Sequence, residues 1–144
     1  MKTIFVASLV CVLTGSVAVR SHAMSSDEDN GLSLLNRIDY SPALTTSGQP
    51  TEAELALIAS AGYDRVIFLA FTNHPKAVAH EDDIVRDLGL QFIHIPVEWE
   101  SPRSTDFAAF AAVMQTQGSI KTLVHCEVNF RASVFGFLYQ VLFE

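Results

Sequence analysis

The sequence is poor in basic residues. Lys and Arg total 9 against 16 Asp and Glu, which gives a net charge of −7, and no basic cluster occurs along the 144 residues. Proteins that bind duplex nucleic acid rely on such clusters to neutralise phosphates, so we expect no nucleic-acid partner. Gly and Pro number only 7 and 5, which excludes collagen-like and low-complexity chains.

Apolar residues, by contrast, are plentiful. They make up 49% of the chain, with 10% aromatic and 17% charged residues. This content excludes a disordered tail or an acidic solvating segment. The length is enough for one modest domain and too small for two.

The long apolar run lies at the N-terminus. Met1 and Lys2 precede Ile4–Val19, whose 16 residues are apolar or small and fall short of the roughly 20 that a membrane-spanning helix needs. Small residues follow at Ser21-His22-Ala23, where a signal peptidase cuts. We expect residues 1–23 to be a signal peptide and the mature protein to be periplasmic or secreted, without stable membrane association. An uncleaved anchor is the alternative.

Cleavage after Ala23 changes the charge and the cysteine content. It leaves 7 basic against 16 acidic residues, a mature charge of −9, and it removes Cys11. Cys126 then has no partner within the chain for a disulfide. A lone thiol in an oxidising compartment needs an explanation. We expect residues 24–31 to be a disordered lead-in and residues 32–144 to form the domain.

Apolar runs and amphipathic stretches alternate from residue 32 onward. Expected strands are 65–71, 90–97 and 120–125. Four helices are expected. The first follows a capping box at Thr51 and Glu54, the second covers 81–88, the third begins at a cap on Ser104 or Thr105, and the fourth covers 132–143. Such alternation predicts an α/β domain with a largely parallel sheet, whose ligands bind beyond the carboxyl ends of the strands.

The last strand-to-helix turn carries the mature cysteine, and runs from Cys126 to Arg131. A short turn of this kind directs several backbone N–H groups into one concavity, and the helix dipole adds about half a positive charge. A thiolate is stabilised there and becomes a nucleophile, while Arg131 offers a planar fork to phosphoryl oxygens. These are the parts of cysteine-dependent phosphoryl transfer. A buried, unreactive cysteine at a strand end is the alternative.

Two sets of residues resemble known phosphatases. Val124-His125-Cys126 leading to Arg131 and Ser133 resembles the active-site loop of the cysteine-based protein tyrosine and dual-specificity phosphatases. The segments 46–51 (TSGQPT), 62–67 (GYDRVI) and 95–97 (IPV) resemble a bacterial phosphatase-like family related to the β-lactamase-hydrolase-like phosphatases.

The resemblance implies a compact dual-specificity-type α/β fold, a parallel-type sheet flanked by helices. It implies hydrolysis of phosphate monoesters of a protein or small molecule, without metal or organic cofactor. Related domains usually continue with more helix, so we expect a C-terminally truncated form in which Phe137, Val141 and Phe143 lack covering partners.

The same resemblance suggests roles for the loop residues. Cys126 is the expected nucleophile, and Arg131 joins the loop residues in holding phosphate. Ser133 is expected to donate to the Cys126 sulfur, and His125 to brace the loop through backbone hydrogen bonds. The remaining loop residues are Glu127, Val128, Asn129 and Phe130. Asn129 stands at the usual glycine position, and Asn tolerates positive φ well.

Two departures from the family pattern affect the chemistry. Four residues separate Cys126 from Arg131 where phosphatases have five, and four is the spacing of rhodanese-like sulfurtransferases. Trp99 stands near the place of the usual general-acid Asp, so the acid candidates are Glu98, Glu100 and Asp106, of which we favour Glu100.

Three functions therefore stay open. The first is an exported phosphatase that acts through a thiophosphate. The second is a catalytically weak or inactive phosphate- or phosphopeptide-binding pseudophosphatase, and the third is a sulfurtransferase. His74, His80 and His94 lack metal-ligand spacing, and we expect them to be surface or core residues.

Overall fold

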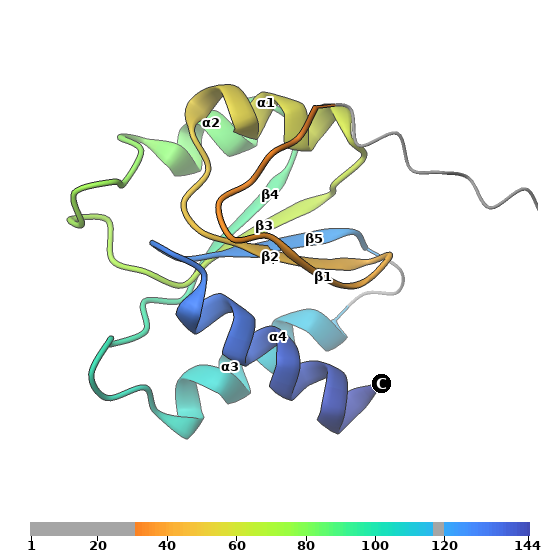
Figure 1. Cartoon of the computed structure of the whole chain (residues 1–144), viewed down its shortest axis with the longest axis vertical. Coiled ribbons are helices and arrows are strands. Elements are labelled where there is room, and N and C mark those ends of the chain that lie inside the picture. The colour runs from red at the N-terminus through yellow and green to blue at the C-terminus, as the bar shows by residue number, and fades with distance from the viewer. Residues whose placement is uncertain (1–30, 117–119) are drawn as a thin grey trace, which may run out of the picture.

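A five-stranded sheet lies between two pairs of helices in the computed structural model, which describes residues 31–116 and 120–144. The predicted signal peptide lies outside the described residues, as does nearly all of the predicted lead-in. The layers confirm the expected α/β class with a sheet flanked by helices (Figure 1). None of the helices within the described ranges has the length and hydropathy to cross a membrane.

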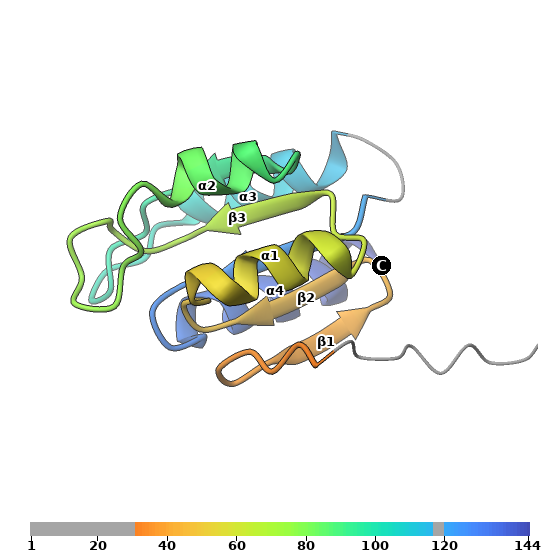
Figure 2. The same ribbon diagram turned by 90° about the horizontal axis from the view of Figure 1, so that it is seen from above.

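The strand order places the last strand of the chain at the centre of the sheet. The order is β1-β2-β5-β3-β4, and all neighbouring pairs are parallel except β1 with β2. Figure 2 shows the β1 arrow pointing opposite to those of β2 and β3. The strands are β1 (Ile38–Ser41), β2 (Leu44–Ser47), β3 (Arg65–Phe68), β4 (Gln91–His94) and β5 (Thr122–His125). The helices are α1 (Glu52–Ser60), α2 (Glu81–Asp87), α3 (Ser104–Gln115) and α4 (Phe130–Phe143). The parallel strands therefore end at one edge, where β2, β5 and β3 lie side by side.

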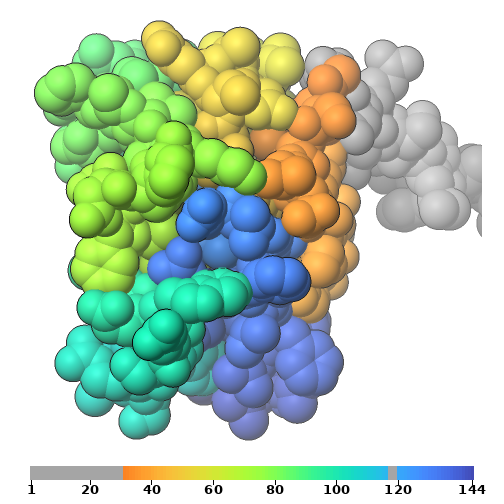
Figure 3. All heavy atoms as spheres, turned by 60° about the vertical axis from the view of Figure 1, so that its left-hand side comes forward, coloured from red at the N-terminus to blue at the C-terminus, as the bar shows by residue number. Residues whose placement is uncertain are grey.

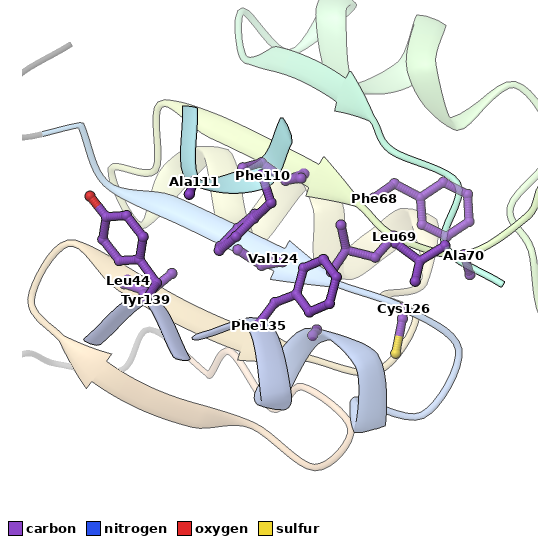
Figure 4. Packing of buried hydrophobic residues seen from close by; sticks show 13 residues of the cluster. Leu44, Phe68, Leu69, Ala70, Phe110, Ala111, Val124, Cys126, Phe135 and Tyr139 are labelled. Carbon is purple, nitrogen blue, oxygen red and sulfur yellow. The ribbon is translucent and has the colours of Figure 1, made fainter. Parts of the chain in front are cut away.

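Each face of the sheet has its own apolar core. Leu123 of β5 and Val66 of β3 pack with Leu55 of α1 and Val85 of α2 on one face. On the other face Val124 packs with residues of α3 and α4, and Cys126 lies at the end of this second core (Figure 4). Successive residues of β5 thus alternate between the two faces, as strand geometry requires.

Three local expectations need correction. The β1–β2 hairpin was not predicted, because β2 is fully buried yet largely polar: Thr45 accepts a hydrogen bond from Tyr63 (2.8 Å) and donates to Asp39 (2.7 Å). Helix α4 begins two residues earlier than expected, at Phe130. The N-cap of α3 is Arg103 rather than Ser104 or Thr105. The capping box of α1 is confirmed.

Helix α4 packs closely on the hairpin through a glycine. A Cβ added at Gly136 would lie 2.7 Å from Cε2 of Tyr40 and 2.8 Å from Cγ2 of Thr46. The Tyr40 ring cannot move freely, because its hydroxyl donates to the Ser133 carbonyl at 2.7 Å. The opposite side of α4 is exposed, including Phe137, Val141 and Phe143, as the sequence led us to expect.

Replacement of Gly136 by Ala tests this contact. Ala favours helix, but the added methyl overpacks against a rigid ring, so we expect Gly136→Ala to lower the free energy of unfolding by about 1–3 kcal/mol. Urea denaturation followed by circular dichroism measures the change. Val134→Ala on the exposed side of α4 is the matched control and should stay within about 0.5 kcal/mol of wild type. An equally stable Gly136→Ala variant would contradict the close packing.

Candidate active site

The loop after β5 lies at the edge where the parallel strands end. In the space-filling view this blue segment is set back between the orange 31–37 segment, the yellow-green 70–80 segment and the teal 98–103 segment (Figure 3). These segments come from four distant parts of the sequence. This edge is where the alternating pattern predicted the ligand site.

Cys126 occupies the base of this region. Its side chain is fully buried, and it is the free cysteine among the described residues. Its backbone N–H donates to the carbonyl of Ser47 at 3.2 Å, so β2 holds the first residue of the loop. In Figure 4 the side chain leaves the end of β5 on the side of the sheet that α4 covers.

The loop's carbonyl groups are held from outside. The Glu127 carbonyl accepts the Gln49 backbone N–H at 3.1 Å, and the Val128 carbonyl accepts Nδ2 of Asn36 at 3.1 Å. The side chain of Asn129 donates back to the Asn36 carbonyl. An isolated antiparallel bridge pairs Val128 with Gly48, whereas the backbone N–H groups of Glu127, Val128 and Phe130 donate no hydrogen bond to any described residue. The loop therefore keeps a set of free donors at the start of α4.

Asn129 turns the chain into the helix. It is the N-cap of α4 and has φ = 76°, in the left-handed region that Asn tolerates better than most residues. The positive φ expected at this position is confirmed. Its Nδ2 contact with Asn36 holds the turn in place.

Arg131 approaches the loop from the first turn of α4. Its guanidinium is buried (8% exposed), and Nη1 donates to the Val97 carbonyl at 2.9 Å. Cζ lies 5.5 Å from the centre of the Trp99 ring, a cation–π contact. Nε is buried and has no hydrogen-bond partner among the described residues. The four-residue spacing thus still gives a buried, oriented guanidinium with an unused donor.

His125 and Ser133 make contacts other than those expected. His125 lies on the opposite face of the sheet from Cys126, and its Nε2 is 3.0 Å from Oε1 of Glu81 instead of a loop backbone group. Strand alternation is the reason, since neighbours in β5 point to opposite faces. The Ser133 hydroxyl donates to the Phe130 carbonyl at 3.1 Å, a first-turn helix contact.

The three acid candidates differ in environment. Glu98 and Glu100 are exposed on either side of Trp99, which is itself 54% exposed and lies 5.8 Å from the Phe130 ring. Asp106 accepts the backbone N–H of Arg103 at 3.0 Å and the guanidinium at 3.2 Å. The backbone hydrogen bond from Arg103 is the main reason that the pKa of Asp106 is lowered. Asp106 therefore caps α3 as an anion and is unsuited to give up a proton.

Sequence reasoning missed a group of residues behind the loop. Glu81 of α2 is buried, and Oε2 accepts Nε2 of Gln49 at 3.0 Å. Oε1 of Gln49 lies 3.2 Å from Nε2 of His74, whose pKa is lowered mainly by burial. No local pattern marks these contacts, because Glu81 belongs to an exposed-looking acidic run.

Two further features of the described residues concern metal binding and cavities. They contain no group of three or more His, Cys, Asp or Glu arranged to hold a metal ion. A cavity of about 360 Å³ lies on the α2 side, between Phe68, Phe92 and His80. Its lining includes no residue of the 126–131 loop, so it is separate from the candidate site.

Comparison with known proteins gives a family. No family model matches the chain, and no curated protein matches it. Among solved structures, it is similar to the inferred phosphatase (DUF442) of Shewanella putrefaciens CN-32, with 36% identity and a TM-score of 0.73 over 78% of this chain and 71% of that chain.

More distant structures share the fold. The kinase-associated phosphatase with its catalytic-site cysteine changed to serine has 13% identity and a TM-score of 0.59, over 70% of this chain and 68% of that chain. A cysteine-to-serine variant of TpbA from P. aeruginosa, in complex with phosphotyrosine, has 15% identity and a TM-score of 0.61, over 75% and 64%. The protein therefore belongs to the DUF442 family of inferred phosphatases, a class of hydrolases, and has the fold of the protein tyrosine and dual-specificity phosphatases.

Proposed function

We propose that the protein is an exported, cysteine-dependent phosphatase that hydrolyses phosphate monoesters through a thiophosphate. The observation that carries the proposal is the set of unused donors around Cys126. The backbone N–H groups of Glu127, Val128 and Phe130 and the buried Nε of Arg131 have no acceptor among the described residues, and all of them belong to the turn that follows the buried Cys126. Donors arranged in this way suit three phosphoryl oxygens and the charge that they carry.

The reaction has two steps. The Cys126 thiolate attacks phosphorus in line, the S–P bond forms as the P–O bond breaks, and the leaving oxygen takes a proton from Glu100. Water then attacks phosphorus, gives a proton to the Glu100 carboxylate, and releases phosphate as the thiolate is restored. Arg131 and the loop amides balance the phosphoryl charge throughout.

The rim favours an aromatic or flat leaving group. Trp99 and Phe130 are both exposed and lie against each other beside Arg131. A structural neighbour binds phosphotyrosine. We infer a phosphorylated protein or a small aryl phosphate as the substrate, a choice that these side chains support through stacking.

A catalytically silent phosphate-binding protein is the second candidate. One observation favours it: Glu98 and Glu100 are both exposed, so neither has the partly buried setting of a typical acid catalyst. The free donors would still bind phosphate in such a protein. Turnover separates the two functions.

The nucleophile is tested with Cys126→Ser. Serine keeps the size of the side chain but supplies no thiolate, so hydrolysis of 4-nitrophenyl phosphate should fall by about 10³-fold or more. Binding of inorganic phosphate, measured by calorimetry, should persist and shows that the loop is intact. Unchanged turnover in Cys126→Ser would disprove the mechanism, and wild-type binding without turnover would establish the silent protein.

The general acid is tested with a matched pair of variants. Loss of a proton donor typically slows such reactions about 10²–10⁴-fold. We expect Glu100→Gln to fall in that range with phenyl phosphate and to be affected less with 4-nitrophenyl phosphate, whose leaving group needs little protonation. Glu98→Gln is the control and should keep near wild-type rates. A larger loss in Glu98→Gln would move the role to that residue.

Export is tested by expressing the full chain in a Gram-negative host. The short apolar segment and the small residues before position 24 should direct cleavage after Ala23. Mass spectrometry of the periplasmic fraction should then find a protein that begins at Met24. An intact chain that begins at Met1 and sediments with membranes would favour the anchor instead.

A further inference from the structure

Glu81 is a buried titratable group that the proposed reaction does not use. It is the first residue of α2, is only 5% exposed, and lies on the face of the sheet opposite Cys126. Burial of a carboxylate is costly unless it receives hydrogen bonds. Its partners therefore explain why it is there.

Two side chains place a nitrogen atom close to this carboxylate. Nε2 of Gln49 donates to Oε2 at 3.0 Å. Nε2 of His125 lies 3.0 Å from Oε1, an ion-pair distance although the two atoms are not aligned for a straight hydrogen bond. The His125 ring is also stacked on Phe68, with centroids 4.7 Å apart and an interplanar angle of 11°. The carboxylate thus joins the end of β5 to the segment after β2.

The contacts continue to the 70–80 segment. Nδ1 of His74 accepts the Lys76 backbone N–H at 3.2 Å, so its proton lies on Nε2, which faces Oε1 of Gln49 at 3.2 Å. Burial lowers the pKa of His74, in keeping with a neutral ring in this role. Gln49 therefore turns its amide N–H group toward Glu81. The series of hydrogen bonds that runs from Lys76 through His74 and Gln49 ends at the Glu81 carboxylate.

Both partners of Glu81 act directly on the Cys126 loop. His125 is the residue before Cys126. The backbone N–H of Gln49 donates to the Glu127 carbonyl at 3.1 Å and so holds the residue after Cys126. A shift of His125 would move the start of the loop, and a shift of Gln49 would move the Glu127 carbonyl.

We propose that Glu81 is a positioning residue for the Cys126 loop. It acts through His125 and Gln49 and touches neither the substrate nor the reacting atoms. The inference rests on the proposed function only for the reactivity of Cys126. It predicts that the carboxylate, and not merely a polar side chain of the same size, is needed behind the loop.

Glu81→Gln tests the need for a carboxylate. An amide offers one acceptor oxygen in place of two, so its NH₂ group must face either Nε2 of Gln49 or Nε2 of His125. We expect alkylation of Cys126 by iodoacetamide, measured by peptide mass spectrometry at neutral pH, to slow about tenfold. Asp87→Asn, an exposed position of the same helix, is the control and should alkylate as wild type.

A second variant separates positioning from general instability. The double variant Gln49→Glu/Glu81→Gln exchanges the amide and the carboxylate, so that each donor again faces an acceptor. It should recover a large part of the lost alkylation rate, short of wild type because the Gln49 contact to the Pro50 carbonyl (3.2 Å) is lost. Thermal melts of both variants separate the two roles: an alkylation rate that changes while the melting temperature does not indicates positioning, and one that only follows the melting temperature indicates stability.

The outcomes distinguish this inference from the proposed function. Alkylation needs no turnover, so a Glu81 effect with rescue in a protein that hydrolyses nothing would support positioning and refute the phosphatase. Wild-type alkylation in Glu81→Gln, or a double variant no faster than the single one, would overturn the positioning role. If Glu81→Gln does not fold, as judged by circular dichroism, the double variant decides: folded and reactive supports the inference, and unfolded overturns it.

Discussion

The chemistry of the site depends on a short loop being held from outside. The carbonyls of Glu127 and Val128 accept from the segments after β2 and before β1, and the backbone N–H groups of Glu127, Val128 and Phe130 have no acceptor in the described part of the chain. Unpaired donors at a helix start are costly unless an anion or water accepts from them. The protein meets this cost with contacts that come from distant parts of the sequence. Because these donors are already in place, they need not reorganise when a charged phosphoryl group binds.

Much of the fold could be predicted because its signals are local. Apolar runs marked β3 and β5, and a capping box marked the start of α1. The hairpin of β1 and β2 carried no such signal. Its buried residues include Thr45, Thr46 and Ser47, and the Thr45 hydroxyl is paired with Tyr63, a partner that the sequence does not reveal. A fully buried but polar strand resembles a loop until its neighbours are known.

The candidate site, like the fold, could be predicted from the sequence only in part. Cys126, Asn129 and Arg131 lie in one turn, so their proximity could be inferred from the chain itself. The acceptor for Arg131 is the Val97 carbonyl, 34 residues away, and the donor to Glu81 is Gln49, 32 residues away. Tertiary contacts of this length have no sequence period. The misplaced expectation for His125 is different, because alternation along β5 already implied that it and Cys126 point to opposite faces.

The two faces of β5 therefore have different roles in the site. Cys126 faces α4, where the helix start and the guanidinium gather positive charge, while His125 faces α2 and the Glu81 carboxylate. A carboxylate as close to the thiolate as Glu81 is to His125 would oppose its ionisation. The sheet therefore lies between the Glu81 carboxylate and the Cys126 thiol, because His125 and Cys126 point to opposite faces. One strand thus presents a reactive thiol on one face and its support on the other, and a shift of one residue in the register of β5 would exchange them.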